Sequence, residues 1–72
     1  MTIYTLSYVD TMGYDDYDEL TTLSVCKTFQ QAYDQMVKKM RIYREHLQRH
    51  FIDGKCDCFY TEKGRYFILR ID

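Results

Sequence analysis

A run of apolar residues at helical spacing extends from Thr28 to Phe51 and constrains the fold more than any other part of the chain. Its steps of three and four place the apolar side chains on one stripe of a 3.6-residue period. Thr28 is a favourable N-cap, and Gln31 follows three residues later, as in a capping box. Gly54 supplies the left-handed residue that ends many helices. The pattern predicts one long helix over 28–51. Its apolar positions are Phe29, Ala32, Tyr33, Met36, Met40, Tyr43, Leu47 and Phe51.

The length of this helix sets a packing problem. At about 1.5 Å per residue it extends roughly 36 Å, whereas a seven-residue strand covers only about 23 Å. We therefore expect the C-terminal part of the helix to project beyond the sheet. The loop before the second strand, the C-terminal hairpin or a second copy of the chain would have to cover it.

Four segments with strand-like alternation flank the helix, at Ile3–Val9, Glu19–Lys27, Lys55–Thr61 and Arg65–Ile71. Asp10–Asp18 is polar and contains Gly13, which predicts a long hairpin loop. Glu62–Gly64 predicts a short turn. The chain is therefore predicted to be a single α+β domain over 1–72. Its architecture is a two-layer β-β-α-β-β fold with a four-stranded, mainly antiparallel sheet and one long helix packed on one face.

Alternation within the strands predicts which side chains meet the helix. In the first strand we expect Tyr4, Leu6 and Tyr8 to point inward, and Leu23 and Val25 share one face of the second strand. Cys56 and Cys58 are expected as small core residues under the helix. The second face of the sheet is left without a cover, which favours a homodimer through this face or through the projecting helix. The residues assigned to that face are Ile3, Thr5, Val9, Thr22, Phe59, Tyr66, Ile68 and Arg70.

Composition limits the classes of function. Ten Lys and Arg against eleven Asp and Glu give a net charge of −1, which argues against direct nucleic-acid binding. The sequence contains no apolar run long enough for a membrane span and no signal-peptide pattern, so we expect a cytoplasmic protein without membrane contact. The three cysteines are expected to be reduced thiols.

No pattern of catalytic residues is present. Neither Cys26 nor Cys58 has the orienting carboxylate and oxyanion hole that a cysteine nucleophile needs near a His. All glycines are isolated, so no phosphate-binding loop is predicted. We expect a protein that is not an enzyme and needs no cofactor.

An acidic segment in the first loop is the main candidate for a binding site. Tyr14, Asp15, Asp16, Tyr17, Asp18 and Glu19 combine two tyrosines with four acids and no base. Carboxylates in this arrangement can occupy a basic groove where phosphates would otherwise bind, and the rings add buried area. The segment predicts binding to a host protein with a basic surface, by mimicry of a nucleic acid.

The alternatives use other parts of the chain. Lys38, Lys39, Arg41, Arg44 and Arg49 would form a phosphate-binding ridge on the long helix of a nucleic-acid-binding domain. His46, His50, Cys56 and Cys58 have the ligand types of a structural zinc site, although their order and spacing match no usual zinc motif. The simplest interpretation of both charged regions is a solvated surface.

In size, in tyrosine content, in its acidic loop and in its lack of catalytic residues, the chain resembles the small proteins with which phages and mobile elements block host defence systems, anti-CRISPR proteins among them. This resemblance is one of type and assigns no residue. It implies a non-enzymatic inhibitor that engages a host nucleic-acid-handling protein.

Overall fold

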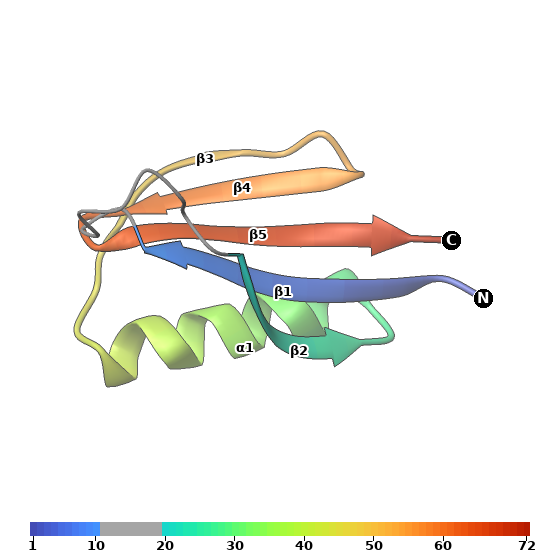
Figure 1. The fold of residues 1–72 in the computed structure, drawn as a ribbon, viewed down its shortest axis with the longest axis horizontal. Coiled ribbons are helices and arrows are strands. Elements are labelled where there is room, and N and C mark those ends of the chain that lie inside the picture. The colour runs from blue at the N-terminus through green and yellow to red at the C-terminus, as the bar shows by residue number, and fades with distance from the viewer. Residues whose placement is uncertain (11–19) are drawn as a thin grey trace.

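The computed structural model describes residues 1–10 and 20–72. In chain order its elements are β1 (Ile3–Asp10), β2 (Thr21–Cys26), α1 (Phe29–Ile42), β3 (Leu47–Phe51), β4 (Cys56–Thr61) and β5 (Gly64–Ile71). The strands form a five-stranded sheet in the order β2-β1-β5-β4-β3, and neighbouring strands are antiparallel throughout (Figure 1). The predicted α+β class is confirmed, but the described sheet has five strands instead of four.

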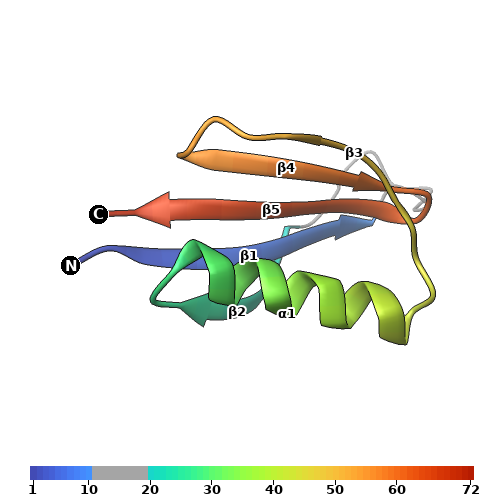
Figure 2. The same cartoon turned by 180° about the vertical axis from the view of Figure 1, so that it is seen from behind.

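The single helix of the described chain lies on one face of the sheet, across β1, β2 and β5 (Figure 2). Its start agrees with the sequence. The Thr28 hydroxyl accepts a hydrogen bond from the Gln31 backbone N–H at 3.2 Å. The Gln31 side chain reaches back one residue further than a capping box requires and accepts from the Lys27 N–H at 3.1 Å. Ala32, Met36 and Met40, spaced by four, form the buried stripe.

The end of the helix corrects the sequence prediction, because α1 stops at Ile42 and not at Phe51. Arg44 adopts a left-handed conformation with φ of 55°. Its N–H bonds to the Arg41 carbonyl at 3.2 Å, and the Glu45 N–H bonds to the Met40 carbonyl at 2.8 Å. These two bonds form a Schellman motif, which satisfies the last helical carbonyls. Arginine occupies the position where glycine is usual, so this helix end could not be predicted from the residue types.

Residues predicted to continue the helix instead form β3, which adds an outer strand to the sheet. The Glu45 side chain is 92% buried at the start of this segment, with 8% of its surface exposed. It accepts hydrogen bonds from Thr61 at 2.6 Å and Tyr66 at 2.8 Å. If the helix continued past residue 45, the Glu45 carboxylate would lie further along the helix axis, out of reach of the Thr61 and Tyr66 hydroxyls. The predicted projecting helix is therefore wrong. Exposed apolar side chains nevertheless remain in that region, at Ile42, Tyr43, Phe51 and Ile52, and the expected homodimer stays a prediction.

The core lies between α1 and the sheet. The residues that form the core show which face of each strand points toward the helix. Tyr4, Leu6 and Tyr8 face the helix as predicted. The faces of β4 and β5 are the reverse of the prediction: Phe59, Tyr66 and Ile68 belong to the core and not to the second face. Cys56 and Cys58 lie on the opposite side of β4. The fully enclosed core consists of Leu6, Ala32, Met36, Met40, Phe59, Tyr66 and Ile68.

A β-bulge in β2 explains why Leu23 and Val25 do not share one face of the strand, although the sequence predicted that they would. Leu6 pairs with Ser24 and Ser7 pairs with Thr22, so Leu23 is the additional residue on β2. The bulge interrupts the alternation and separates two side chains that were expected on the same face. Leu23 packs against the core, whereas Val25 is 61% exposed.

Replacement of Arg44 by glycine tests the helix end. A non-glycine residue in the left-handed region costs about 1–2 kcal/mol, and glycine costs about 0.5–1 kcal/mol in unfolded-state entropy. We expect Arg44→Gly to raise the free energy of unfolding by roughly 0.5–1 kcal/mol, measured by urea denaturation.

The matched control is Gly54→Ala, because Gly54 has φ of 85° and an added methyl group would meet no other atom there. Any loss of stability in this control reports the backbone strain of alanine at this φ, reduced by the unfolded-state entropy that glycine contributes. If Arg44→Gly instead lowered stability, the helix would not end in the left-handed turn described above.

Candidate functional site

The structure does not bring together the residues of the basic ridge or of the zinc site that were predicted from the sequence. The acidic segment, Tyr14 to Glu19, lies outside the described residues, and its role stays a prediction. All ten Lys and Arg but only seven of the eleven acids lie in the described part of the chain, which therefore carries a charge of +3. The net negative charge of the protein comes from the segment 11–19.

The basic residues do not form one ridge. Lys38, Lys39 and Arg41 lie on α1, and Arg44 lies in the turn that follows. Arg49 lies on β3 opposite Tyr60, on the side of the sheet away from the helix. The groove that Lys38 and Arg41 line also contains the Asp34 carboxylate. The predicted place of Arg49 on the helix is therefore wrong, and a role of the other four residues in nucleic-acid binding stays a prediction.

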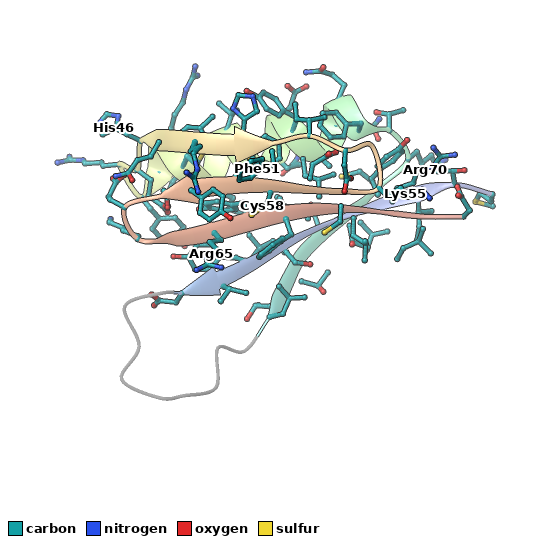
Figure 3. All side chains as sticks on the ribbon, turned by 90° about the horizontal axis from the view of Figure 1, so that it is seen from above. His46, Phe51, Lys55, Cys58, Arg65 and Arg70 are labelled. Atoms are coloured by element: carbon teal, nitrogen blue, oxygen red, sulfur yellow. The ribbon has the colours of Figure 1, made fainter. Side chains whose placement is uncertain are left out.

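The four possible zinc ligands are not brought together either. His50 faces the helix side, where its ring stacks on Phe59 at 5.9 Å between centroids. Cys56 and Cys58 point to the other side of the sheet. His46 lies at the far end of the β3–β4 hairpin from Lys55 (Figure 3). Among residues 1–10 and 20–72, no group of three His, Cys, Asp or Glu side chains could hold a metal ion.

A cavity of about 220 Å³ lies at the C-terminal end of α1. Both oxygens of Glu45 in its wall are already occupied by the hydroxyls of Thr61 and Tyr66. Burial and the hydrogen bond to Glu45 raise the pKa of Tyr66. A carboxylate held in this way stabilises the turn after the helix. The cavity is lined by Tyr8, Leu23, Lys39, Tyr43, Glu45, Lys63 and Tyr66.

The sheet face opposite α1 forms the candidate site, and we call it the open face. The strand registers arrange its side chains in four rows across the sheet. The first row contains Arg49, Tyr60, Arg65 and Val9; the second Phe51, Cys58, Phe67, Ser7 and Thr22; the third Cys56, Leu69, Thr5 and Val25; the fourth Ile71 and Ile3. None of these positions is an Asp or Glu.

The open face changes in character from one end to the other. Its aliphatic rows expose large side chains, with Val25 at 61%, Leu69 at 40% and Ile71 at 41%. Phe51 in the second row is 55% exposed. A contiguous apolar surface of this kind is typical of a site that contacts another molecule.

The first row combines charge with aromatic rings, and we call Arg49, Tyr60 and Arg65 the arginine–tyrosine row. The Arg49 guanidinium carbon lies 5.1 Å from the centre of the Tyr60 ring and 5.2 Å from that of Phe51. The Arg65 guanidinium carbon lies 5.4 Å from the centre of the Tyr60 ring. These distances are within the range of cation–π attraction. Figure 3 shows Arg65 on the side of the sheet away from the helix.

Sequence reasoning missed this row. Both alternating sets in β5 are mainly apolar and each contains one arginine, so the pattern did not reveal which set pointed outward. Arg49 and Phe51 were assigned to a helix, where their pairing with β4 could not be foreseen. The one available signal was the alternation of Leu47, Arg49 and Phe51 with polar neighbours, which is compatible with a strand.

Comparison of the chain with models of protein families, with curated proteins and with solved structures finds no match. No residue role is therefore carried over from a relative. Within the described residues, no helix combines the length and the apolar character needed to cross a membrane.

Replacement of Tyr66 by phenylalanine tests the contact with Glu45. Tyr66 is 2% exposed, and its hydroxyl donates to a carboxylate. A hydrogen bond to a charged group is worth about 1.5–3 kcal/mol, so we expect Tyr66→Phe to lower the free energy of unfolding by roughly that amount in urea denaturation. Tyr43→Phe is the control, because Tyr43 is 56% exposed and should change stability by less than about 0.5 kcal/mol.

The same contact predicts a dependence on pH. The pKa of Tyr66 is raised in the folded protein relative to the usual 10.0. Its contribution to stability is therefore fully present below pH 10 and is lost as the pH rises through the folded-state pKa. We expect the stability difference between wild type and Tyr66→Phe to be constant from neutral pH to about 9 and to shrink in more alkaline solution. A difference that grew with pH would contradict the assignment.

Proposed function

We propose that this chain is a non-enzymatic protein-binding module whose contact surface is the open face of the sheet. The observation that supports the proposal is the exposed set of apolar side chains opposite α1, including Val25, Phe51 and Leu69. Aromatic residues and arginine are enriched in protein interfaces and in their energetically dominant positions. The open face presents both kinds of residue together.

The dimensions of the open face suit a small interface or the centre of a larger one. Four rows about 6.7 Å apart and five strands about 4.8 Å apart give a flat area of roughly 500 Å². A standard protein interface buries about 800 Å² on each partner, and weak, transient contacts bury less. The partner would therefore cover the whole face and extend past its rim.

A protein is a better partner for this face than a nucleic acid. The third and fourth rows present aliphatic groups from Val25, Leu69 and Ile71. Such groups bury well against apolar side chains, but they offer bases neither stacking partners nor hydrogen bonds. Binding of nucleic acid through the helix is not supported, because Arg49 is separated from the basic residues of α1.

In its most specific form, the proposal is an inhibitor from a phage or mobile element that acts on a host nucleic-acid-handling protein. The four acids between Asp15 and Glu19 support this version, since they are concentrated in one segment of a chain whose remainder carries +3. They would provide a second contact, to a basic part of the same partner.

Photo-cross-linking from the open face tests the proposal. A benzoylphenylalanine introduced at Leu69 lies in the third row, and one at Gln35, on the exposed side of α1, is the matched control. After irradiation in cells that naturally produce the protein, we expect Leu69 but not Gln35 to yield one defined protein adduct, identified by mass spectrometry. With that partner purified, Val25→Lys should weaken binding about tenfold, because burying a valine contributes roughly 1.5 kcal/mol.

The other outcomes identify a different use of the face. An adduct containing only this chain would show a homodimer through the open face, and a nucleic-acid adduct would replace the proposal by its alternative. The absence of any adduct from Leu69, with one obtained from Gln35, would contradict the proposal and move the contact surface to the helix.

A further inference from the structure

We infer that the arginine–tyrosine row is a carboxylate-binding site, which receives acidic side chains of a protein partner at one end of the open face. The inference rests on the proposed function and names the chemistry of the partner: a group of Asp or Glu side chains adjoining an apolar stripe. The row would thereby fix the direction in which the partner lies across the sheet.

The geometry holds two guanidinium groups against the same tyrosine ring before any partner binds. Tyr60 lies between Arg49 and Arg65 in the register, and both guanidinium carbons are within 5.4 Å of the centre of its ring. Phe51 lies against the same Arg49 at 5.2 Å and makes an edge contact with Tyr60, with centroids 6.0 Å apart. Rings that hold an arginine in place reduce the side-chain entropy lost on binding.

Among residues 1–10 and 20–72, no side chain or backbone group occupies the guanidinium N–H groups of Arg49 or Arg65. Within the described residues, the ion pair of the structure joins Arg70 to Asp72, and neither Arg49 nor Arg65 donates a hydrogen bond to any of them. Both side chains are exposed. Guanidinium groups present a planar set of N–H donors that matches a carboxylate in a bidentate arrangement. Two cations that flank one ring, in a row that contains no Asp or Glu, favour an anionic ligand.

The rest of the open face determines which anion fits. Phosphates of a nucleic acid would be followed by bases, but the rows beyond the arginines end in aliphatic side chains such as Leu69 and Ile71. An amphipathic protein segment provides carboxylates for the first row and apolar side chains for the others, over a distance of roughly 20 Å. Charge complementarity at one end and apolar burial at the other therefore favour an acidic protein segment.

Nuclear magnetic resonance with two short peptides tests the inference, because it detects binding even at millimolar affinity. The probes are acetyl-Glu-Glu-Leu-Leu-amide and acetyl-Gln-Gln-Leu-Leu-amide, which differ only in charge. We expect the acidic peptide to shift the side-chain Nε–Hε signals of Arg49 and Arg65 and to bind about fivefold more tightly at low salt, as expected for two exposed ion pairs of about 0.5 kcal/mol each.

Matched variants distinguish binding at the arginine–tyrosine row from nonspecific electrostatic attraction to the protein. Arg49→Gln with Arg65→Gln should abolish the preference for the acidic peptide, and the same pair changed to lysine should retain only part of it. Lys38→Gln with Arg41→Gln removes the same charge from α1 and should leave the preference unchanged. Circular dichroism should show that all variants remain folded at the temperature of the titration, since these side chains are exposed.

Each remaining outcome decides against the inference. Equal binding of the two peptides, or absence of any shift at Arg49 and Arg65, would overturn it. Tighter binding of an oligothymidylate than of the acidic peptide at the same row would assign the site to nucleic acid instead. The proposed function is judged separately, because photo-cross-linking from Leu69 does not depend on the arginines.

Discussion

The hydrogen bonds of the Glu45 carboxylate to Thr61 and Tyr66 are the interaction on which the rest of the structure depends. They join the residue just after the helix to β4 and β5 at a buried position. A buried carboxylate is costly unless its oxygens are hydrogen-bonded, so the chain has to leave the helix where both hydroxyls can reach it. The left-handed turn at Arg44 is the backbone conformation that meets this requirement.

The early helix end determines which surfaces are available for binding. Because α1 stops at Ile42, the following residues form β3 and extend the sheet beyond the helix. Phe59 is enclosed between Tyr33 and His50 on the helix side. On the other side, β3 contributes Arg49 and Phe51 to the open face. The contact of Glu45 with Thr61 and Tyr66 thus allows β3 to form and places Arg49 and Phe51 beside Tyr60 on the open face.

The sequence predicted those parts of the fold that depend on local patterns. The helix start at Thr28, the inner face of β1 and the α+β class followed from capping chemistry and alternation. The helix end did not, since Arg44 occupies a position where glycine is the usual signal and the apolar spacing continues to Phe51. The faces of β4 and β5 could not be predicted either, because they depend on register with strands distant in sequence. The candidate site depends on both features: Tyr60 and Arg65 were predicted on the correct strands but not on the open face, and Arg49 was predicted on the helix.

The backbone conformation of residues 43–51 in solution decides whether the helix ends early and β3 forms. We expect helical Cα and Cβ chemical shifts that end at Ile42, extended shifts from Leu47 to Phe51, and a nuclear Overhauser effect between backbone protons of Arg49 and Tyr60. Helical shifts that continued through Phe51 would contradict this expectation, since Arg49 and Phe51 would then lie on the helix and the arginine–tyrosine row would not exist.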